Sequence, residues 1–463
     1  MRLRKADFRG RVNGLLGIEF DDSKLTSCSG LELVGAFVRT IAFRDQLREV
    51  ERRVCFGGDL RFSSMIMLFV GMLLVGARRL RHIRSMDNDP VFLRFAQLKR
   101  LPDERTLSRF LQRFGHRTWP YLDDLNFGVV QRSLTDLDCS RLTLGMDGSV
   151  LTTGLQVERA FRGFNPHHRK NPSYYPITLH VAQTNHIIAH RNRSGDIHDS
   201  RGSARFLEDT VRRMRREMGF AGILELRTDT AFFQREVLEA CDRQSIEYAI
   251  KMPMMPWLNI RSKIAKIREK NWRVVDRQRE VQGCFLEVDV SCWDRTERVA
   301  VYRKKVYHKT KKNYQLDLFD PNDGTWEYSA VATNKHLGLL ALWRFANGQG
   351  GQEKTYAELK DGYAYGCIPT QSYAANTAWQ KLNVLSHNLM VSYQLATTAC
   401  SKPRSLKRTA IRLIESIRTI RLTWLNKAGR VVNKSGRNIL RLTRNSETQR
   451  RYSEMTRSLD QAA

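Results

Sequence analysis

Two aspartates occupy equivalent places at the ends of strand-like segments. Asp147 ends LTLGMD, and Asp229 ends ILELRTD just before a predicted helix. Ligands of open α/β sheets collect at the carboxyl ends of the strands, so we expect these two carboxylates to converge on one divalent cation. Simpler interpretations are a turn before Gly148 for the first and a helix cap for the second. Asp196 and Asp199 could add a spare carboxylate near the cation, but a loop role is the favoured interpretation for both.

A third acid lies much later in the chain. Glu353 follows the glycine-rich NGQGGQ and opens the helix-like EKTYAELK, in which Lys360 comes seven residues later. Seven residues correspond to about 700° of rotation, so both side chains lie on nearly the same helical face. Two Asp and one Glu form the oxygen-only ligand set that suits Mg²⁺ or Mn²⁺, ions that activate a water or a 3′-hydroxyl in phosphoryl transfer. The alternative for Glu353 and Lys360 is a solvated surface stripe.

The segments around the acids predict an α/β sheet. Strand-like alternation marks three neighbouring strands, and helix and strand patterns then alternate as far as Met252. The predicted strands are RLTLGMDGSVL, PITLHVAQ, IIAHR, GILELRTD and IEYAIKM, and the helices are SARFLEDTVRRMRREMG and FFQREVLEACDRQ. Strands followed by alternating helix and strand are typical of an α/β fold.

The remaining segments divide the chain into five parts. Residues 253–330 read as a β-rich insertion, and helical spacing then returns, with a long buried helix from Ser372 to Ala396. The expected parts are a helical N-terminal DNA-binding domain, a sheet domain split in two by the insertion, and a basic helical C-terminal region, at 1–135, 136–252, 253–330, 331–400 and 401–463. The last part has 16 Lys and Arg against 4 Asp and Glu, a net charge of +12.

The charge balance favours a nucleic-acid partner. The chain of 463 residues carries 78 Lys and Arg against 48 Asp and Glu, a formal net charge of +30. Such a surplus drives counterion release from a polyphosphate, and an anionic membrane is a weaker second partner. Arg105, Arg109 and Arg113 form a stripe at four-residue spacing that either contacts phosphate or is a solvated basic face.

Membrane insertion and secretion are not expected. The apolar run from Ser63 to Ala77 is shorter than the roughly 18 to 20 residues that span hydrocarbon, so we interpret it as a buried helix. The basic N-terminus lacks the apolar segment and cleavage site of a signal peptide. The eight cysteines form no CxxC pair, which fits reduced thiols. We expect a cytoplasmic, nucleoid-associated protein.

The order of these elements resembles bacterial DDE transposases of the insertion-sequence 1380 group, distant relatives of the piggyBac transposases. The resemblance lies in LTLGMDGS, ILELRTDTAFFQREVLEAC and QEKTYAELKDGY, and it is most specific in SYAANTAWQKLNVLSHNL. It implies an RNase H-like catalytic core interrupted by the insertion, a metal-binding triad of Asp147, Asp229 and Glu353, and a phosphate contact by Lys360. The implied enzyme binds terminal inverted repeats as a homodimer, and with two Mg²⁺ or Mn²⁺ ions it cuts the ends and joins them to target DNA.

The resemblance has one departure before the third acid. Relatives usually carry Tyr seven residues and Arg four residues before the Glu, where this chain has Ala346 and Gln349. A shifted register could let Arg344 or Trp343 compensate. We therefore expect Gln349 and Arg344 to contact DNA.

Tryptophans of the insertion are further candidates for DNA contacts. Related enzymes use an insertion aromatic to hold a flipped base, which stacking on an extruded base would require. The four candidates are Trp257, Trp272, Trp293 and Trp326, of which most are expected to be core residues. Trp293 is the one we expect to contact DNA.

Two other classes of function fit the same sequence. A non-catalytic DNA-binding protein derived from a transposase would keep the basic surface and would not need converging acids. A metal-dependent nuclease with the same core would cut DNA without joining it. Only a joining assay separates that nuclease from a transposase.

Overall fold

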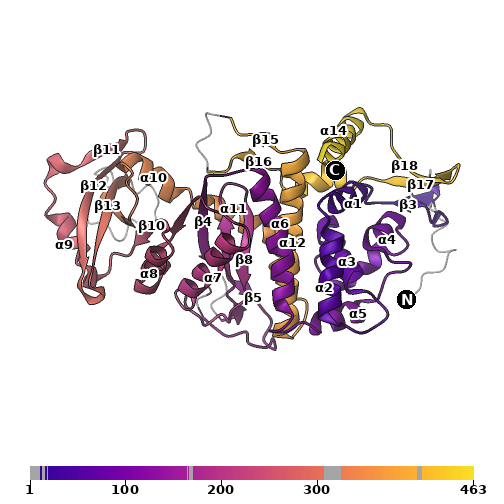
Figure 1. Ribbon diagram of the computed structural model, residues 1–463, viewed down its shortest axis with the longest axis horizontal. Helices are drawn as coiled ribbons and strands as arrows, with labels where there is room; N and C mark the ends of the chain where they lie inside the picture. Colours follow the sequence, from indigo (N-terminus) through magenta and orange to yellow (C-terminus); the bar gives the residue numbers. More distant parts are fainter. Residues whose placement is uncertain are drawn as a thin grey trace. The chain divides into compact units, whose positions relative to one another are not determined.

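The protein folds into two compact units. The first combines residues 1–113 with 415–463, and the second comprises residues 114–414. The computed structural model describes residues 11–12, 16–17, 19–163, 165, 170–306, 325–403 and 409–462 (Figure 1). The N-terminal helices and most of the C-terminal region, which were expected as separate parts, thus share one unit. The N-terminal segment of that unit ends at residue 113, where the sequence predicted a boundary at 135.

A nine-stranded mixed sheet forms the centre of the second unit (Figure 1). Its strand order is β11-β12-β13-β14-β10-β9-β4-β7-β8. The central strands β4 (Arg141–Gly148), β9 (Ile223–Thr228) and β10 (Glu247–Met252) are parallel. Beyond β4, the strands β7 (Ile177–Val181) and β8 (His186–Arg191) continue the sheet antiparallel. Four of these five strands lie within the segments predicted from the alternation of apolar residues, and β8 begins one residue earlier than predicted, at His186.

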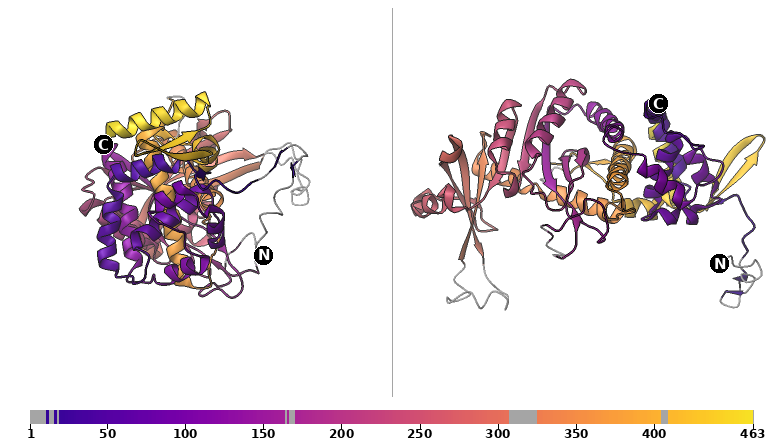
Figure 2. Two further views of the ribbon diagram at one scale, coloured as in Figure 1. Left: turned by 90° about the vertical axis from the view of Figure 1, so that its right-hand side faces the viewer. Right: turned by 90° about the horizontal axis from the view of Figure 1, so that it is seen from below.

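The β-rich insertion extends the same sheet. The strands β11 (Arg273–Asp276), β12 (Val281–Val290), β13 (Arg295–Val306) and β14 (Thr325–Thr333) pair antiparallel in chain order, and β14 pairs antiparallel with β10. Figure 2 shows the long strands of this segment in orange-red. The insertion also holds α9 (Ile260–Ala265) and the short turns η4 (Pro256–Leu258), η5 (Glu269–Asn271) and η6 (Ser291–Trp293). The prediction of β structure in this segment is confirmed.

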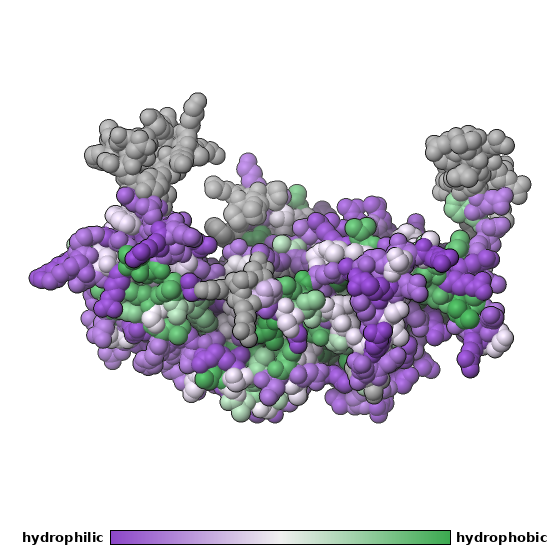
Figure 3. Space-filling view, turned by 90° about the horizontal axis from the view of Figure 1, so that it is seen from above, coloured by the Kyte–Doolittle hydropathy of each residue, from purple (hydrophilic) through white to green (hydrophobic). Residues whose placement is uncertain are grey.

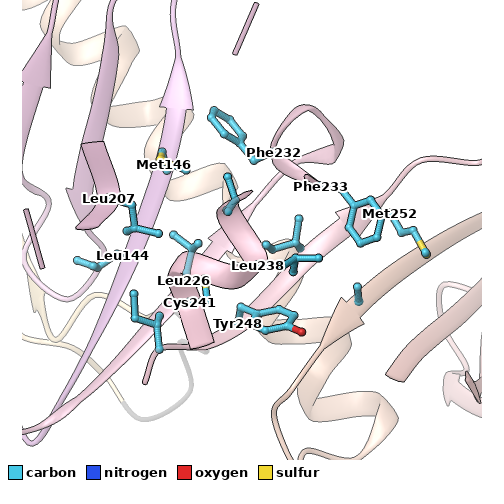
Figure 4. Packing of buried hydrophobic residues seen from close by; sticks show 14 of the residues in the cluster. Leu144, Met146, Leu207, Leu226, Phe232, Phe233, Leu238, Cys241, Tyr248 and Met252 are labelled. Atoms are coloured by element: carbon cyan, nitrogen blue, oxygen red, sulfur yellow. The ribbon is translucent and has the colours of Figure 1, made fainter. Parts of the chain in front are cut away.

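One face of the sheet is covered by α7 (Ser203–Arg216) and α8 (Arg235–Arg243). Successive side chains of a strand point to opposite faces, and Leu144, Leu226 and Tyr248 of the three parallel strands point into one apolar cluster with these helices (Figure 4). Burying each such side chain stabilises the fold by about 1.5–3 kcal/mol. This cluster holds the two strands that carry the aspartates in fixed register.

The other face of the sheet carries α10 (Leu339–Asn347) and α11 (Gly350–Gly362). Ala249 of β10 shares a second apolar cluster with Leu342 and Ala346 of α10. The helix α11 lies beside β4 and is held there by hydrogen bonds that are described with the site. The strands therefore lie between two layers of helices.

The longest helix, α12 (Tyr373–Thr397), packs against α6 (Trp119–Asp136) and β8. Its buried Asn388 accepts the Ile187 N–H at 3.0 Å and donates to the Ile187 carbonyl at 2.7 Å. Satisfying both ends of the amide lets a polar residue lie in the core. The long buried helix expected from Ser372 to Ala396 is confirmed.

The first unit is mainly helical. Its helix α3 (Phe62–Val75) matches the apolar run and is buried over almost its whole length. Of the described helices, none alone is long and apolar enough to cross a membrane, whereas α3 and η2 (Leu80–Met86), bent by 82°, pass that test as a pair. The other helices are α1 (Leu31–Thr40), α2 (Phe43–Val54), α4 (Pro90–Ala96), α5 (Glu104–Gln112), α13 (Ile417–Ile420), the π-helical turn η7 (Arg421–Leu425) and α14 (Ser446–Ala462).

The C-terminal region is not entirely helical, so the prediction for 401–463 was wrong in this respect. The strands β17 (Gly429–Lys434) and β18 (Arg437–Leu442) form a hairpin, and β17 also pairs with β3 (Leu25–Thr26). Ser435 and Gly436 have φ values of 51° and 75°, the positive values that a two-residue hairpin turn requires. The signal that the helical prediction overlooked is the Ser-Gly pair between two short β-forming segments.

Several two-residue strands complete the list of elements. They form short antiparallel pairs outside the main sheet. These strands are β1 (Arg11–Val12), β2 (Leu16–Gly17), β5 (Leu151–Thr152), β6 (Ser173–Tyr174), β15 (Cys400–Ser401) and β16 (Arg412–Leu413).

Candidate active site at the ends of two parallel strands

Asp147 and Asp229 are brought side by side by strand pairing. The parallel strands β4 and β9 pair in register up to Gly145 and Arg227, and each aspartate comes two residues after its strand's member of that pair. Parallel strands end at the same edge of a sheet, so the two carboxylates lie at one edge. This register is the structural reason why the two acids lie close to each other.

Each aspartate is held by the backbone that follows it. The Gly148 N–H donates to Asp147 Oδ1 at 2.8 Å. The Ala231 N–H donates to Asp229 Oδ1 at 3.1 Å, so this side chain also caps the turn η3 (Thr230–Phe232). Both side chains are half-buried, and neither forms an ion pair within the described part of the chain. Their remaining oxygen atoms are thus suited to a cation.

The electrostatics of the pair also fit a cation. Burial, reinforced by the charges of Asp229 and Asp199, raises the pKa of Asp147 to about 8. Burial likewise raises the pKa of Asp229, an effect that its backbone hydrogen bond, Lys251 and His198 partly oppose. Neighbouring carboxylates that resist ionisation are those whose repulsion a bound divalent cation would relieve. The donor set, made of carboxylate oxygens, is the one that Mg²⁺ or Mn²⁺ prefers.

A further carboxylate, Asp199, lies beside the pair. A Cβ placed on Gly148 would overlap Asp199 Oδ1, which shows how closely this loop approaches the end of β4. The Tyr175 hydroxyl donates to Asp199 at 2.7 Å, and the buried guanidinium of Arg193 lies 3.3 Å from its other oxygen. The loop role that we expected for Asp199 is therefore combined with a place next to the acids, whereas Asp196 is exposed.

Three side chains attach the Glu353 helix to the sheet. Gln352 Nε2 donates to the Gly145 carbonyl at 3.1 Å, and Tyr356 Oη donates to the Asp147 carbonyl at 2.8 Å. Thr355 lies 3.2 Å from His180 Nε2 on the neighbouring strand β7. A Cβ at Gly145 would overlap the buried Gln352 amide, so only glycine permits this approach. These contacts fix α11 over β4.

Glu353 and Lys360 share the side of α11 that carries Tyr356. Tyr356 follows Glu353 by three residues and precedes Lys360 by four, and such spacings place side chains on one helical face. The Glu353 charge is among those that raise the pKa of Asp147. Burial lowers the pKa of Lys360, while the charge of Asp147 acts in the opposite direction. Both predicted residues therefore interact electrostatically with the first acid.

The three acids do not form a closed metal site in this conformation. Among the residues that the structure describes, no three His, Cys, Asp or Glu side chains lie close enough together to hold one ion. Glu353 is exposed, and the two aspartates are half-buried. The three acids are therefore not all within ligand distance of one ion.

The residues that precede Glu353 differ in exposure. Ala346 is buried in the cluster under α10, and Gln349 has its Oε1 buried with no hydrogen-bond partner in the described residues. Arg344, in the last turn of α10, is exposed. Of the two predicted DNA contacts, Arg344 therefore presents its charge at the surface, and Gln349 keeps its carbonyl oxygen inside.

An aromatic cluster connects the insertion to the turn after Asp229. The ring of Phe233, four residues after this aspartate, lies 5.2 Å from the ring of Trp293. The ring of Trp257 lies 5.4 Å from the ring of Trp293, and Trp257 is 52% exposed. Trp272, in contrast, is buried against the guanidinium of Arg303. Trp293 is thus in contact with the segment that follows Asp229.

Sequence reasoning missed Arg227. This buried residue of β9 donates from Nη1 to the Phe345 carbonyl at 3.3 Å and to the Thr409 hydroxyl at 3.0 Å. Burial lowers its pKa to about 10. It thereby joins the strand that leads to Asp229 to the end of α10, just before the Glu353 helix. An arginine in a strand carries no sequence signal for such a contact.

The remaining predicted DNA contacts lie in the first unit. Arg105 and Arg109 are exposed on α5, whose N-terminus is capped by the Asp103 side chain at 2.7 Å from the Thr106 N–H. Arg113 donates to the Gly57 carbonyl and so also stabilises the fold. The surface view in Figure 3 shows hydrophilic side chains over most of the face drawn, with smaller apolar patches between them.

Comparison with known proteins gives the family. The family described as Transposase DDE domain group 1 matches residues 12–463, nearly the whole chain. No curated protein matches. Among solved structures, the chain is similar to the cryo-EM structure of a piggyBac transposase synaptic complex with hairpin DNA, with 12% identity, a TM-score of 0.43, and coverage of 81% of this chain and 75% of that one. With acids at the two strand ends and a family match of this extent, the chain belongs to the DDE transposases of group 1.

Proposed function

We propose that this chain is a cut-and-paste DNA transposase of the bacterial insertion-sequence 1380 group. The observation that carries the proposal is the pairing of Asp147 and Asp229 at the ends of adjacent parallel strands, beside a helix tied to the first of them. The basic surface, with a net charge of +30 on the whole chain, supports a DNA substrate. The chain acts in the cytoplasm, on the terminal inverted repeats of its element and on target DNA.

An RNase H-like core is supported by the strand order. The strands β8, β7 and β4 form an antiparallel meander, and β9 and β10 then follow in parallel beside β4. In this order the end of β4, the first strand of the core, lies next to the end of β9, the fourth strand. The insertion enters after β10 and precedes the helix with the third acid.

The triad of Asp147, Asp229 and Glu353 would hold two Mg²⁺ or Mn²⁺ ions. When bound, such ions activate a water or a 3′-hydroxyl and stabilise the leaving oxygen of a phosphodiester. The two aspartates provide a fixed pair of carboxylates at the sheet edge, and Glu353 supplies the third from the helix. Lys360 places its ammonium group on the same helical face, where it would contact a phosphate next to the cleaved bond.

The DNA would be held by residues around this edge and by the first unit. Arg344 offers an exposed charge before the Glu353 helix, and Trp293 with its neighbours offers a stacking surface beside the Asp229 turn. Arg105 and Arg109 offer phosphate contacts from α5. Because two element ends must be cut together, the active species would be a homodimer on DNA.

A cleavage and joining assay tests the proposal. Duplexes that carry the two element ends are incubated with Mg²⁺ and a target plasmid, and wild type is compared with Asp229→Asn and with Glu236→Gln. Glu236 is an exposed acid of α8, outside the proposed site, and serves as the matched control. We expect cleaved ends and joined products with wild type and the control, and neither product with Asp229→Asn or with EDTA.

The same assay separates the two rival functions. Cleavage without any joined product would favour a metal-dependent nuclease. Tight binding of the ends without cleavage by any variant would favour a non-catalytic DNA-binding protein. Cleavage by Asp229→Asn at the wild-type rate would overturn the assignment of the site.

A further inference from the structure

Four arginines line a pocket in the first unit, and none of its lining residues has been assigned a role above. The pocket has a volume of about 480 Å³. It lies where the end of α1, the start of α2 and the end of α4 meet. Its charged and amide side chains are Arg39, Arg44, Arg48, Arg94, Asp45 and Gln97.

The pocket carries more positive charge than its neighbours neutralise. Asp45 pairs with Arg48 at 3.0 Å, and Glu32 pairs with Arg94 at 3.1 Å and with Arg39 at 3.9 Å. Two carboxylates thus face four guanidinium groups. Because these pairs are largely exposed, each is worth only about 0–1 kcal/mol and can exchange for a stronger anionic partner.

Arg44 is the least neutralised of the four. Its Nη2 donates to the Phe95 carbonyl at 3.0 Å, and within the described residues it forms no ion pair with a carboxylate. Burial and the charges of Arg39 and Arg48 lower its pKa. The Phe95 contact fixes a half-buried guanidinium next to two others, an arrangement that an anion would stabilise.

The backbone around the pocket is held in unusual conformations. Ala42, between α1 and α2, has a φ of 51°, and Gln97, which ends α4, has a φ of 56°. A left-handed conformation costs a residue other than glycine about 1 kcal/mol or more. The sharp corner at Ala42 brings Arg39 of one helix beside Arg44 of the next.

We propose that this four-arginine pocket binds the phosphate backbone of DNA. Guanidinium groups bind phosphate oxygens in pairs of parallel hydrogen bonds, so several of them around one pocket match a phosphodiester. The proposal rests on the proposed function, because a transposase must hold DNA, and it assigns a part of that task to specific residues. A small free anion shares the same chemistry and is separated from DNA by the test.

The test measures duplex binding in EDTA, so that it does not depend on catalysis. The affinity of the full chain for a 30-base-pair duplex is measured by fluorescence anisotropy between 50 and 200 mM salt. The variant Arg44→Gln/Arg48→Gln is compared with Arg52→Gln/Arg53→Gln, which removes the same charge from exposed positions of the same helix outside the pocket. A second pocket variant, Arg39→Gln/Arg48→Gln, changes only largely exposed side chains and so preserves the packing.

We expect both pocket variants to raise the Kd at least tenfold and to lower the slope of log K against log salt by about 1 to 2, as expected for one or two lost phosphate contacts. The Arg52/Arg53 control should change the Kd less than threefold. Equal weakening in pocket and control variants would overturn the proposal. Calorimetry with inorganic phosphate is the second arm: binding that only the pocket variants lose, with duplex affinity unchanged, would assign the pocket to a free anion and also overturn it.

This result is distinguishable from failure of the proposed function. If the chain binds DNA through the pocket and yet never cuts or joins DNA, the pocket proposal stands and the transposase proposal fails. If the chain cuts and joins DNA and the pocket variants bind DNA with unaltered affinity, the transposase proposal stands and the pocket proposal fails.

Discussion

The hydroxyl of Tyr356 donates a hydrogen bond of 2.8 Å to the backbone carbonyl of Asp147. This bond joins the helix with Glu353 and Lys360 directly to the residue that carries the first acid. The same hydroxyl lies 2.6 Å from the Thr178 hydroxyl of β7, so it is held from two strands. The relative position of the acids therefore depends on a residue that is not itself a metal-ligand candidate.

Replacing Tyr356 with Phe should lower the rate of end cleavage about 5- to 30-fold. The change removes one or two buried hydrogen bonds, worth about 1–2 kcal/mol, without removing the ring from the core. Because the residue positions the site, the Kd for DNA should stay within twofold of wild type. Single-turnover cleavage and duplex binding measure the two effects, with Tyr328→Phe at the surface of β14 as control. Equal losses in rate and in DNA affinity would refute a positioning role.

Replacing Asp147 with Asn should stabilise the metal-free protein while abolishing activity. The pKa of Asp147 is about 8 in the folded state, against 3.8 for the unperturbed group, so the folded state holds a proton that the unfolded chain releases. The contribution of this carboxyl to the stability of the wild type therefore falls as pH rises from about 4 to about 8. At pH 7.5 in EDTA we expect the variant to gain about 1–3 kcal/mol, or a few degrees in Tm, after allowing for solvent screening.

Adding Mg²⁺ should reverse the order of stability of wild type and Asp147→Asn. The cation stabilises only a site whose carboxylates are intact, so the Tm of wild type should rise with Mg²⁺ and that of Asp147→Asn should not. Differential scanning fluorimetry measures both. A variant that Mg²⁺ stabilises as much as wild type would show that Asp147 is not a ligand.

Removing the Lys360 ammonium group should slow the cleavage of DNA. This group lies on the face of α11 that carries Glu353, and it interacts with the charge of Asp147. We expect Lys360→Ala to slow cleavage at least tenfold. Lys354→Ala, an exposed lysine on the same helix, should stay within twofold. Comparable losses of cleavage rate in both variants would mean that any positive charge on this helix has the same effect and that Lys360 has no specific role.

The second unit should become less stable in acid because it buries neutral histidines. Burial lowers the pKa of His180 and His186 to about 3 and that of His387 to about 4. The unfolded chain binds protons at these positions below about pH 6.5 and the folded state does not, so the contribution of these histidines to stability falls as pH decreases from about 6.5 to about 4. It opposes the contribution of Asp147, whose pKa is raised. Each histidine contributes a slope of about 1.4 kcal/mol per pH unit in this range.

Urea unfolding between pH 4.5 and 7 checks this slope. His387→Gln keeps a donor for the Asn185 carbonyl, which His387 Nε2 contacts at 3.1 Å, and should reduce the slope by about one proton. A slope that His387→Gln leaves unchanged would contradict the burial of a neutral imidazole at this position.

Much of the sheet and the place of two acids could be predicted from the sequence, because the signals are local. Alternating apolar residues marked β4 and β9. Asp147 is the last residue but one of β4, and Asp229 directly follows β9. Once the strands are parallel neighbours, their ends must meet. The helix that carries Glu353 and Lys360 could also be predicted, because the helical spacing of EKTYAELK is a signal within one short segment.

The rest could not be predicted, because it depends on contacts between distant parts of the chain. Asp199 reaches the acids only through its bonds to Tyr175 and Arg193. Arg227 acquires its role from the Phe345 carbonyl, 118 residues away. The union of both ends of the chain in one unit follows from pairing such as that of β3 with β17, which neither segment signals alone.

The role of the three acids is measured most directly by single-turnover joining of precut element ends to a target plasmid in the presence of Mg²⁺. The variants are Asp147→Asn, Asp229→Asn and Glu353→Gln, with Glu236→Gln as the control. Precut ends remove the cleavage step, so joining reports the chemistry of the site alone. We expect the three triad variants to bind the ends normally and to lose joining at least a thousandfold, while the control joins at the wild-type rate. Joining that persists in any variant of the two aspartates would contradict this expectation.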